Sequence, residues 1–350
     1  MPKTKEELNS LIDSFEEATR YWISTIADAS LISKVKAAKV ADPTNELLKL
    51  IKLLKAHATK VGIIFKPENL KKEFDPAFNT LSKLSETLIL TISVVSQLDT
   101  TSISKLFYNE ILKQVKQLLE SNHMFAKELK LIFEDLENEV DTEELKKDEM
   151  DGRLLSVARI WSNCDSLVKL IENGNLSLLT DKIKQSIFIL EDGFEEFQEW
   201  AENPEEIDDD PFGFSDDEED EADDKEPPSS VNQDDDEETN REELTTYAKK
   251  WLKKIELIKL LIASFKKSLP KSTPGESIDT IFAIQTNLVS LVDKFIVDLM
   301  LERTIDKELE SYTNSLTKES IKLAHIARDI HQNNKKASWY ETWETKYNSI

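Results

Sequence analysis

The chain has 350 residues, of which 39% are hydrophobic and 6 are glycine. This supplies enough apolar surface for one large or two medium helical cores, and too few turn residues for a sheet protein. The formal net charge of −24 is concentrated in residues 201–240, which hold 20 Asp or Glu and one Lys. The rest of the chain is nearly neutral, so the sequence does not have the excess of basic residues that is typical of a nucleic-acid-binding protein. An anionic membrane surface would repel the acidic segment.

Apolar residues recur at three- and four-residue steps along most of the chain, which predicts long amphipathic helices. The helices expected before the acidic segment span 5–39, 44–65, 75–97, 102–138, 150–172 and 177–202. The sequence NGN at 173–175 predicts a helix stop, because Gly and Asn tolerate left-handed backbone geometry. The helices expected after the segment span 241–265, 278–300, 303–332 and 336–349.

The predicted fold class is all-α, with long antiparallel helices in two packed bundles. The expected domains are an N-terminal bundle over 1–203, a disordered acidic insert over 204–239, and a C-terminal bundle over 240–350. The insert is expected to be disordered because its low hydrophobicity and high charge cannot offset the entropy lost on ordering.

The insert contains candidate partner-docking residues. Asp210, Phe212 and Phe214 lie in the sequence DPFGF, and aromatic side chains in a solvated segment are typical anchors for a partner. Ser215 is followed by acidic residues, which favours phosphorylation by an acidophilic kinase. The alternative is that the insert is a solvated linker, as most runs of like charge are. Similarly, KKWLKK at 249–254 forms either a solvated helix face or a docking surface for the acidic insert.

No catalytic, cofactor-binding or metal-binding residues are predicted. Glycine is too sparse for phosphate-binding loops, and none of the four histidines has a second histidine at the four-residue spacing that would put two ligands on one helix face. The single cysteine, Cys164, excludes an intrachain disulfide and favours a reducing compartment. No run of about 18 apolar residues predicts a membrane span. We therefore expect a protein of the cytoplasm and nucleus that is not an enzyme.

Three stretches together resemble the cyclin-D-binding protein family, the Grap and cyclin-D-interacting proteins. They are DGRLLSVARIWSNCDSL at 151–167, IFILEDGFEEFQEWAENPEEIDDDPFGFSDDEED at 187–220 and SIDTIFAIQTNLVSLVDKFIVDLM at 277–300. The most specific feature is Trp161 followed by Cys164 and Asp165, a motif expected to lie in the core. The chain is shorter than the family at its N-terminus and has its own acidic segment.

The resemblance implies helical bundles similar to those of vinculin and α-catenin. It also implies a cytoplasmic and nuclear regulator of the cell cycle and of transcription, with cyclin-like or helix-loop-helix partners. We therefore expect a non-enzymatic protein-interaction regulator that binds neither nucleic acid nor membrane. Two other functions are open: an acidic chaperone for basic proteins, which salt-sensitive binding through the insert would reveal, and a cytoskeletal or adhesion scaffold, which actin co-sedimentation would reveal.

Overall fold

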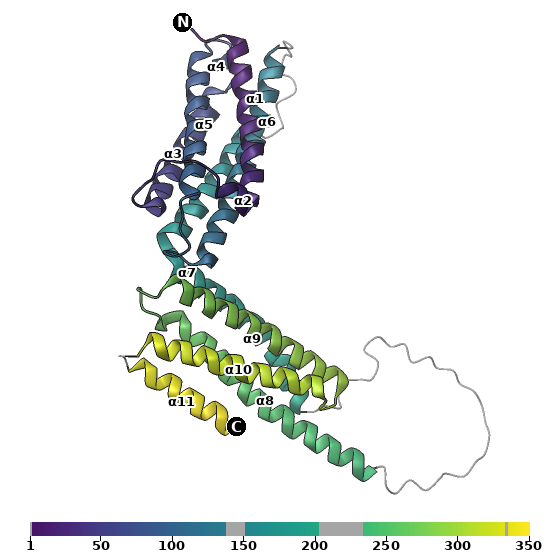
Figure 1. Cartoon of the computed structure of the whole chain (residues 1–350). Coiled ribbons are helices and arrows are strands. Elements are labelled where there is room, and N and C mark those ends of the chain that lie inside the picture. The colour runs from purple at the N-terminus through teal and green to yellow at the C-terminus, as the bar shows by residue number, and fades with distance from the viewer. Residues whose placement is uncertain (1, 138–150, 203–233, 333–334) are drawn as a thin grey trace, which may run out of the picture. The chain divides into compact units, whose positions relative to one another are not determined.

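The computed structural model describes residues 2–137, 151–202, 234–332 and 335–350. Every regular element in these ranges is a helix, which confirms the all-α prediction (Figure 1). The chain divides into two compact units, Met1–Leu178 and Leu179–Ile350.

The division between the units falls inside α7 (Gly152–Glu202) rather than at residue 203, where the first bundle was expected to end. Gly174 interrupts this helix with φ 75° and ψ −176°, a backbone conformation open essentially to glycine alone. The predicted helix stop at 173–175 is therefore confirmed. The residues after Leu178 join the second unit because their aromatic side chains pack there, as Phe197 does against Phe295 at 6.0 Å.

The expected insert, 204–239, falls mostly on residues 203–233, which lie outside the described residues. The prediction of an insert is wrong for its last residues, 234–239, because α8 (Asp234–Ser268) already begins at Asp234. The sequence DDDEE at 234–238 suits the start of a helix, since carboxylates favour the positive end of the helix dipole.

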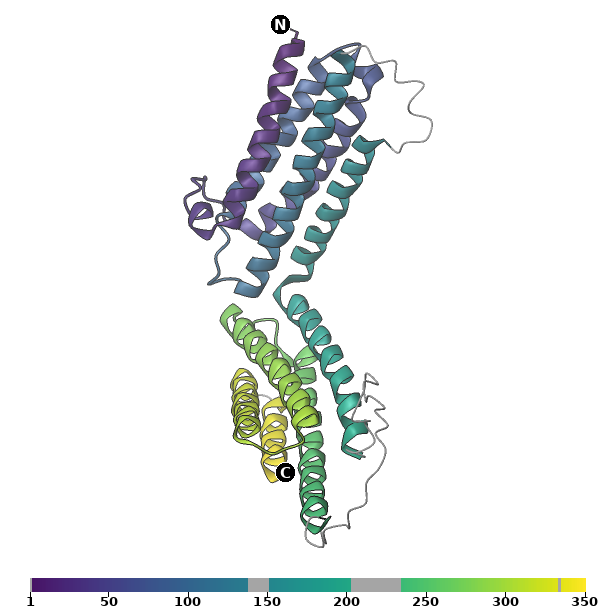
Figure 2. The ribbon, with the colours of Figure 1, turned by 90° about the vertical axis from the view of Figure 1, so that its right-hand side faces the viewer.

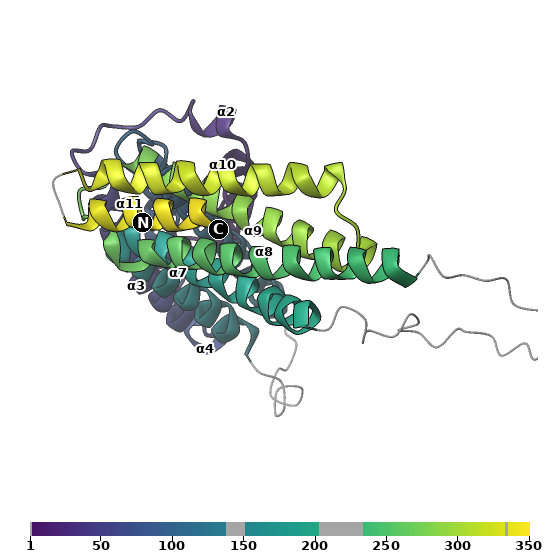
Figure 3. The ribbon, with the colours of Figure 1, turned by 90° about the horizontal axis from the view of Figure 1, so that it is seen from below.

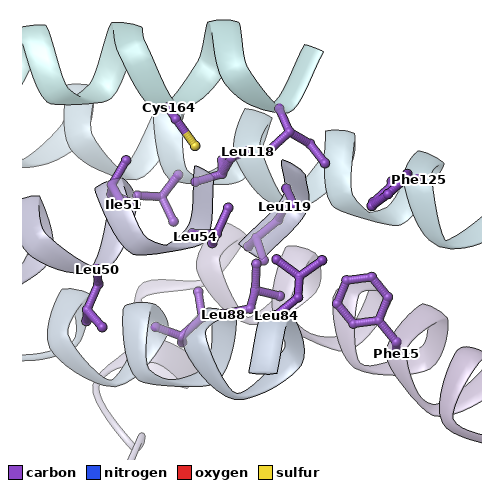
Figure 4. Packing of buried hydrophobic residues seen from close by; sticks show 14 of the residues in the cluster. Phe15, Leu50, Ile51, Leu54, Leu84, Leu88, Leu118, Leu119, Phe125 and Cys164 are labelled. Carbon is purple, nitrogen blue, oxygen red and sulfur yellow. The ribbon is translucent and has the colours of Figure 1, made fainter. Parts of the chain in front are cut away.

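The first unit packs its long helices around one apolar core. They are α1 (Lys5–Ala27), α3 (Pro43–Ile64), α5 (Asp75–Val95), α6 (Lys105–Glu137) and the first half of α7, with the short helices α2 (Ala29–Ile32) and α4 (Pro67–Leu70). Helix α1 packs against α5 and α6, and α3 packs against α5 (Figure 2). Phe15, Leu54, Leu84, Leu119 and Cys164 bring side chains from all five long helices into this core (Figure 4).

The first predicted helix, 5–39, is wrong beyond Ala27. Thr4 begins α1 with a capping box, in which its hydroxyl accepts from the backbone N–H of Glu7, an arrangement that stabilises a helix start. Asp28 has an extended backbone and its carboxylate accepts from the backbone N–H of Ser30, so it ends α1 and caps α2. Residues 35–40 have no regular structure.

The second unit contains the second half of α7 together with α8, α9 (Gly275–Glu302), α10 (Lys307–Ile330) and α11 (Lys336–Ser349). Helices α10 and α11 pack together and both contact α8 (Figure 3). Its core is rich in aromatic side chains. Phe295 of α9 lies 5.0 Å from the ring of Trp251, and Trp343 donates a 2.8 Å hydrogen bond to the carbonyl of Leu257.

By length and composition alone, helix α9 could cross a membrane. This contradicts the prediction that no segment is long and apolar enough to do so. In the second unit one side of α9 is buried, including Ile281, Leu288, Phe295 and Leu299. Core helices of bundles meet the same criterion because they bury an apolar stripe.

Candidate interaction surface

Helix α3 and the first half of α7 are tied together by side-chain pairs along their shared seam. The pairs are Lys52 Nζ with Glu172 Oε1 at 2.8 Å, Lys55 Nζ with Asp165 Oδ1 at 2.6 Å, and Trp161 Nε1 donating to Thr59 Oγ1 at 3.0 Å. Residue numbers rise on α3 as they fall on α7, so the two helices are antiparallel. All these side chains are at least partly exposed.

The seam closes tightly at the end of α3. A Cβ atom on Gly62 would lie 2.7 Å from Cγ2 of Val157, which is closer than side chains tolerate, so the absence of a side chain lets the helices approach. Arg153 is 5% exposed, donates from Nη1 to the carbonyl of Gly62 and pairs through Nη2 with Asp151 Oδ2 at 2.5 Å. The buried guanidinium therefore fixes the start of α7 against the end of α3.

Apolar side chains are exposed at this same end. Leu154, Ala158 and Trp161 follow one another at four and three residues and so form one stripe on α7, with Leu154 52% and Trp161 39% exposed. On α3, Ile63 is 61% exposed and, by the antiparallel register, comes opposite the start of this stripe. We call Ile63, Leu154, Ala158 and Trp161 the seam surface.

The family motif is divided between the core and the seam surface. Cys164 is fully buried as expected, and burial raises the pKa of its thiol to about 12. Trp161 and Asp165 were expected in the core, and both are exposed. Asp165 pairs with Lys55, whose Nζ also lies 5.7 Å from the centre of the Trp161 ring. Asp165 directly follows Cys164 and points about 100° away from it, so the helix places these two side chains on different faces.

The docking residues expected in the acidic insert, Asp210, Phe212, Phe214 and Ser215, lie outside the described residues. Their role stays a prediction.

Sequence reasoning missed the apolar half of the seam surface. The spacing of Leu154, Ala158 and Trp161 was visible, but only Trp161 was considered, as part of a motif assigned to the core. Ile63 and the partners on α3 carried no signal of their own, because their position depends on packing between helices more than 80 residues apart in sequence.

The histidines occupy separate places in the fold. His57 Nδ1 lies 2.9 Å from Thr87 Oγ1, and His123 Nδ1 lies 3.1 Å from Thr19 Oγ1. Burial lowers the pKa of both imidazoles. Within the described ranges, no group of three or more His, Cys, Asp or Glu side chains is placed to hold a metal ion.

The fold and the seam surface define a helical protein of two units that presents an apolar, aromatic surface bordered by ion pairs. Residues 46–203 match the family model described as Grap2 and cyclin-D-interacting, N-terminal, which confirms the family resemblance seen in the sequence. Both sides of the seam lie inside the match. The chain is also 27% identical over an alignment of 371 residues, covering 99% of this chain and 98% of the relative, to the uncharacterized protein YLR287C of Saccharomyces cerevisiae (strain ATCC 204508 / S288c).

Proposed function

We propose that this is a non-enzymatic interaction protein that binds a helix of a partner protein at the seam surface. The observation that carries the proposal is the exposure of Ile63, Leu154 and Trp161 along the seam between α3 and α7, which a buried arginine and a close helix contact hold together.

The seam surface has the composition of a protein-binding site. Tryptophan is among the residues that contribute most to binding energy, and such anchors are surrounded by contacts that add little energy themselves. Here Trp161 is followed along the seam by the Lys55–Asp165 and Lys52–Glu172 pairs. An exposed apolar surface on two antiparallel helices can receive the apolar face of a third helix, whose anchors recur at three- and four-residue steps.

The matched family is described as cyclin-D-interacting. On this basis we propose a cyclin-like or helix-loop-helix partner, and a role in regulating the cell cycle or transcription in the cytoplasm and nucleus. The predicted docking residues Phe212 and Phe214 and phosphorylation of Ser215 would supplement binding at the seam surface.

The test replaces Leu154 by glutamate and recovers the bound proteins from the protein's own cells. Leu154→Glu places a charge in the apolar stripe near the start of α7, where a carboxylate does not disturb the helix dipole. The matched control is Leu90→Glu on α5, since Leu90 is also 52% exposed in the same unit. Both variants should keep the helical circular dichroism and unfolding midpoint of the unchanged protein within a small margin.

We expect the control to retain the partner and Leu154→Glu to lose it. The same set of bound proteins with both variants would overturn the proposal. If deletion of residues 205–232 removes the partner while Leu154→Glu does not, the acidic insert is the docking element, and the proposed site is wrong.

A further inference from the structure

Four lysines lie close together near the middle of α8. Lys249, Lys250 and Lys253 are exposed, and none forms an ion pair with a carboxylate in the part of the chain that the structure describes. Lys254 is half-buried, with Nζ 5.4 Å from the centre of the Trp251 ring and 4.5 Å from that of Tyr347. We call Lys249, Lys250, Lys253 and Lys254 the lysine cluster.

The lysine cluster is electrostatically unfavourable by itself. Lys249 and Lys253 are four residues apart, as are Lys250 and Lys254, and like charges at this spacing destabilise a helix. Burial, followed by the neighbouring charge of Lys250, lowers the pKa of Lys254. A polyanion bound across the cluster would relieve this repulsion.

The end of α7 lies at the level of the cluster. Trp200 stacks on Phe197 at 5.9 Å, and Phe197 and Trp251 both contact Phe295, at 6.0 Å and 5.0 Å. The chain therefore leaves α7 at Glu202 close to the turns of α8 that carry the lysines.

The segment that follows Glu202 has the complementary charge. Residues 203–233 contain 14 Asp or Glu and one Lys, a net charge of −13. An extended chain spans about 3.3 Å per residue, so about ten residues reach past a cluster that occupies less than two turns of helix. A tethered segment of this kind meets its site at an effective concentration on the order of millimolar.

We propose that the acidic residues between 205 and 224 of the same chain bind across the lysine cluster of α8. Binding is electrostatic, and it weakens as salt shortens the range of the interaction. A phosphate on Ser215 adds up to two negative charges and strengthens the contact.

The test measures how fast chymotrypsin cleaves the full chain after Phe212 and Phe214 at low and at high salt. The first variant carries Lys249→Gln, Lys250→Gln and Lys253→Gln. The control carries Lys294→Gln, Lys307→Gln and Lys318→Gln, three exposed lysines of the same unit, so the two variants have equal net charge. The control also corrects for any effect of salt on the protease.

At low salt we expect the first variant to be cleaved roughly fivefold faster than the control, which corresponds to ~1 kcal/mol of docking. The difference should disappear at about 0.5 M salt, and the protection should not depend on protein concentration. Equal cleavage of the two variants at low salt would overturn the proposal. Protection that grows with protein concentration would also overturn it, because the occupant would then be a second copy.

Discussion

Replacing Gly174 by alanine isolates the cost of one backbone conformation. Gly174 has φ 75° and ψ −176°, and a Cβ built on it meets no atom within 4 Å. The substitution therefore creates no steric clash with neighbouring side chains, and its effect comes from the backbone alone. A residue with a side chain held in this region costs about 1–3 kcal/mol.

Part of this cost is offset in the unfolded state, because alanine has less conformational entropy to lose than glycine, by about 0.4–1 kcal/mol. We therefore expect Gly174→Ala to destabilise the first unit by about 1–2 kcal/mol. A change of backbone at Gly174 also moves the next residue, Asn175. Its Oδ1 accepts hydrogen bonds from the backbone N–H of Ser104 at 3.3 Å and from the Ser104 hydroxyl at 3.2 Å, just before the start of α6.

Gly193→Ala is the matched control in the same helix. Gly193 is helical, and its new Cβ would lie 3.8 Å from Ile296 Cδ1, an ordinary contact. Alanine is favoured over glycine inside a helix by about 1 kcal/mol, so this variant should be more stable than the unchanged protein.

Urea unfolding followed by circular dichroism gives the two shifts, and amide hydrogen exchange assigns each shift to its unit, because a chain of two units need not unfold in one step. A Gly174→Ala variant that unfolds at the same or higher urea concentration than the unchanged protein would refute the assigned backbone conformation.

Three further predictions concern charges and the thiol of the first unit. With a pKa of about 12, only about one Cys164 thiol in ten thousand is ionised at pH 8, so a thiol reagent should react slowly in the native protein and rapidly in urea, and fast native labelling would contradict the burial. A hydrogen bond from Arg153 lowers the pKa of Asp151 from its ordinary value of 3.8 in the folded protein. The Asp151 carboxylate therefore stabilises the fold above pH 3.8, and this stability is lost as the pH falls through the lowered pKa. Asp151→Asn should make the free energy of unfolding fall less steeply with falling pH, and an unchanged dependence would refute the contact. Lys55→Gln removes an exposed ion pair with Asp165 and should lower the free energy of unfolding by less than ~1 kcal/mol, and a larger loss in a urea titration would show that the pair has a structural role.

Apolar periodicity predicted the long helices closely where packing and local signals agree. The second expected helix, 44–65, is α3 at Pro43–Ile64, and the last, 336–349, is α11 at Lys336–Ser349. It failed at Asp28, because the polar hydrogen bond that starts α2 does not disturb the spacing of apolar residues around it.

The unit boundary could not be predicted from local sequence. The helix stop at Gly174 was visible, but the choice of bundle for the following helix depends on partners far along the chain. Phe197 and Trp200 belong to the second unit because Phe295, nearly 100 residues later, completes their packing.

The candidate site was half predictable. Ile160, Cys164 and Leu167 share the buried face of α7, whereas Leu154, Trp161 and Asp165 share the exposed face. Both faces follow from a period of 3.6 residues. Because both faces of α7 carry a large apolar residue, periodicity alone does not say which of the two a neighbouring helix covers.

The most direct test of binding at the seam surface is photo-cross-linking from inside it. A photoreactive amino acid replaces Ala158, which is exposed between Leu154 and Trp161, and in a control chain it replaces Ala283, which is exposed on α9. After irradiation of the protein's own cells, we expect a defined partner cross-linked from position 158, absent from position 283, and lost when Leu154→Glu is added. Identical products from both positions, or a product that survives Leu154→Glu, would contradict the assignment of this surface.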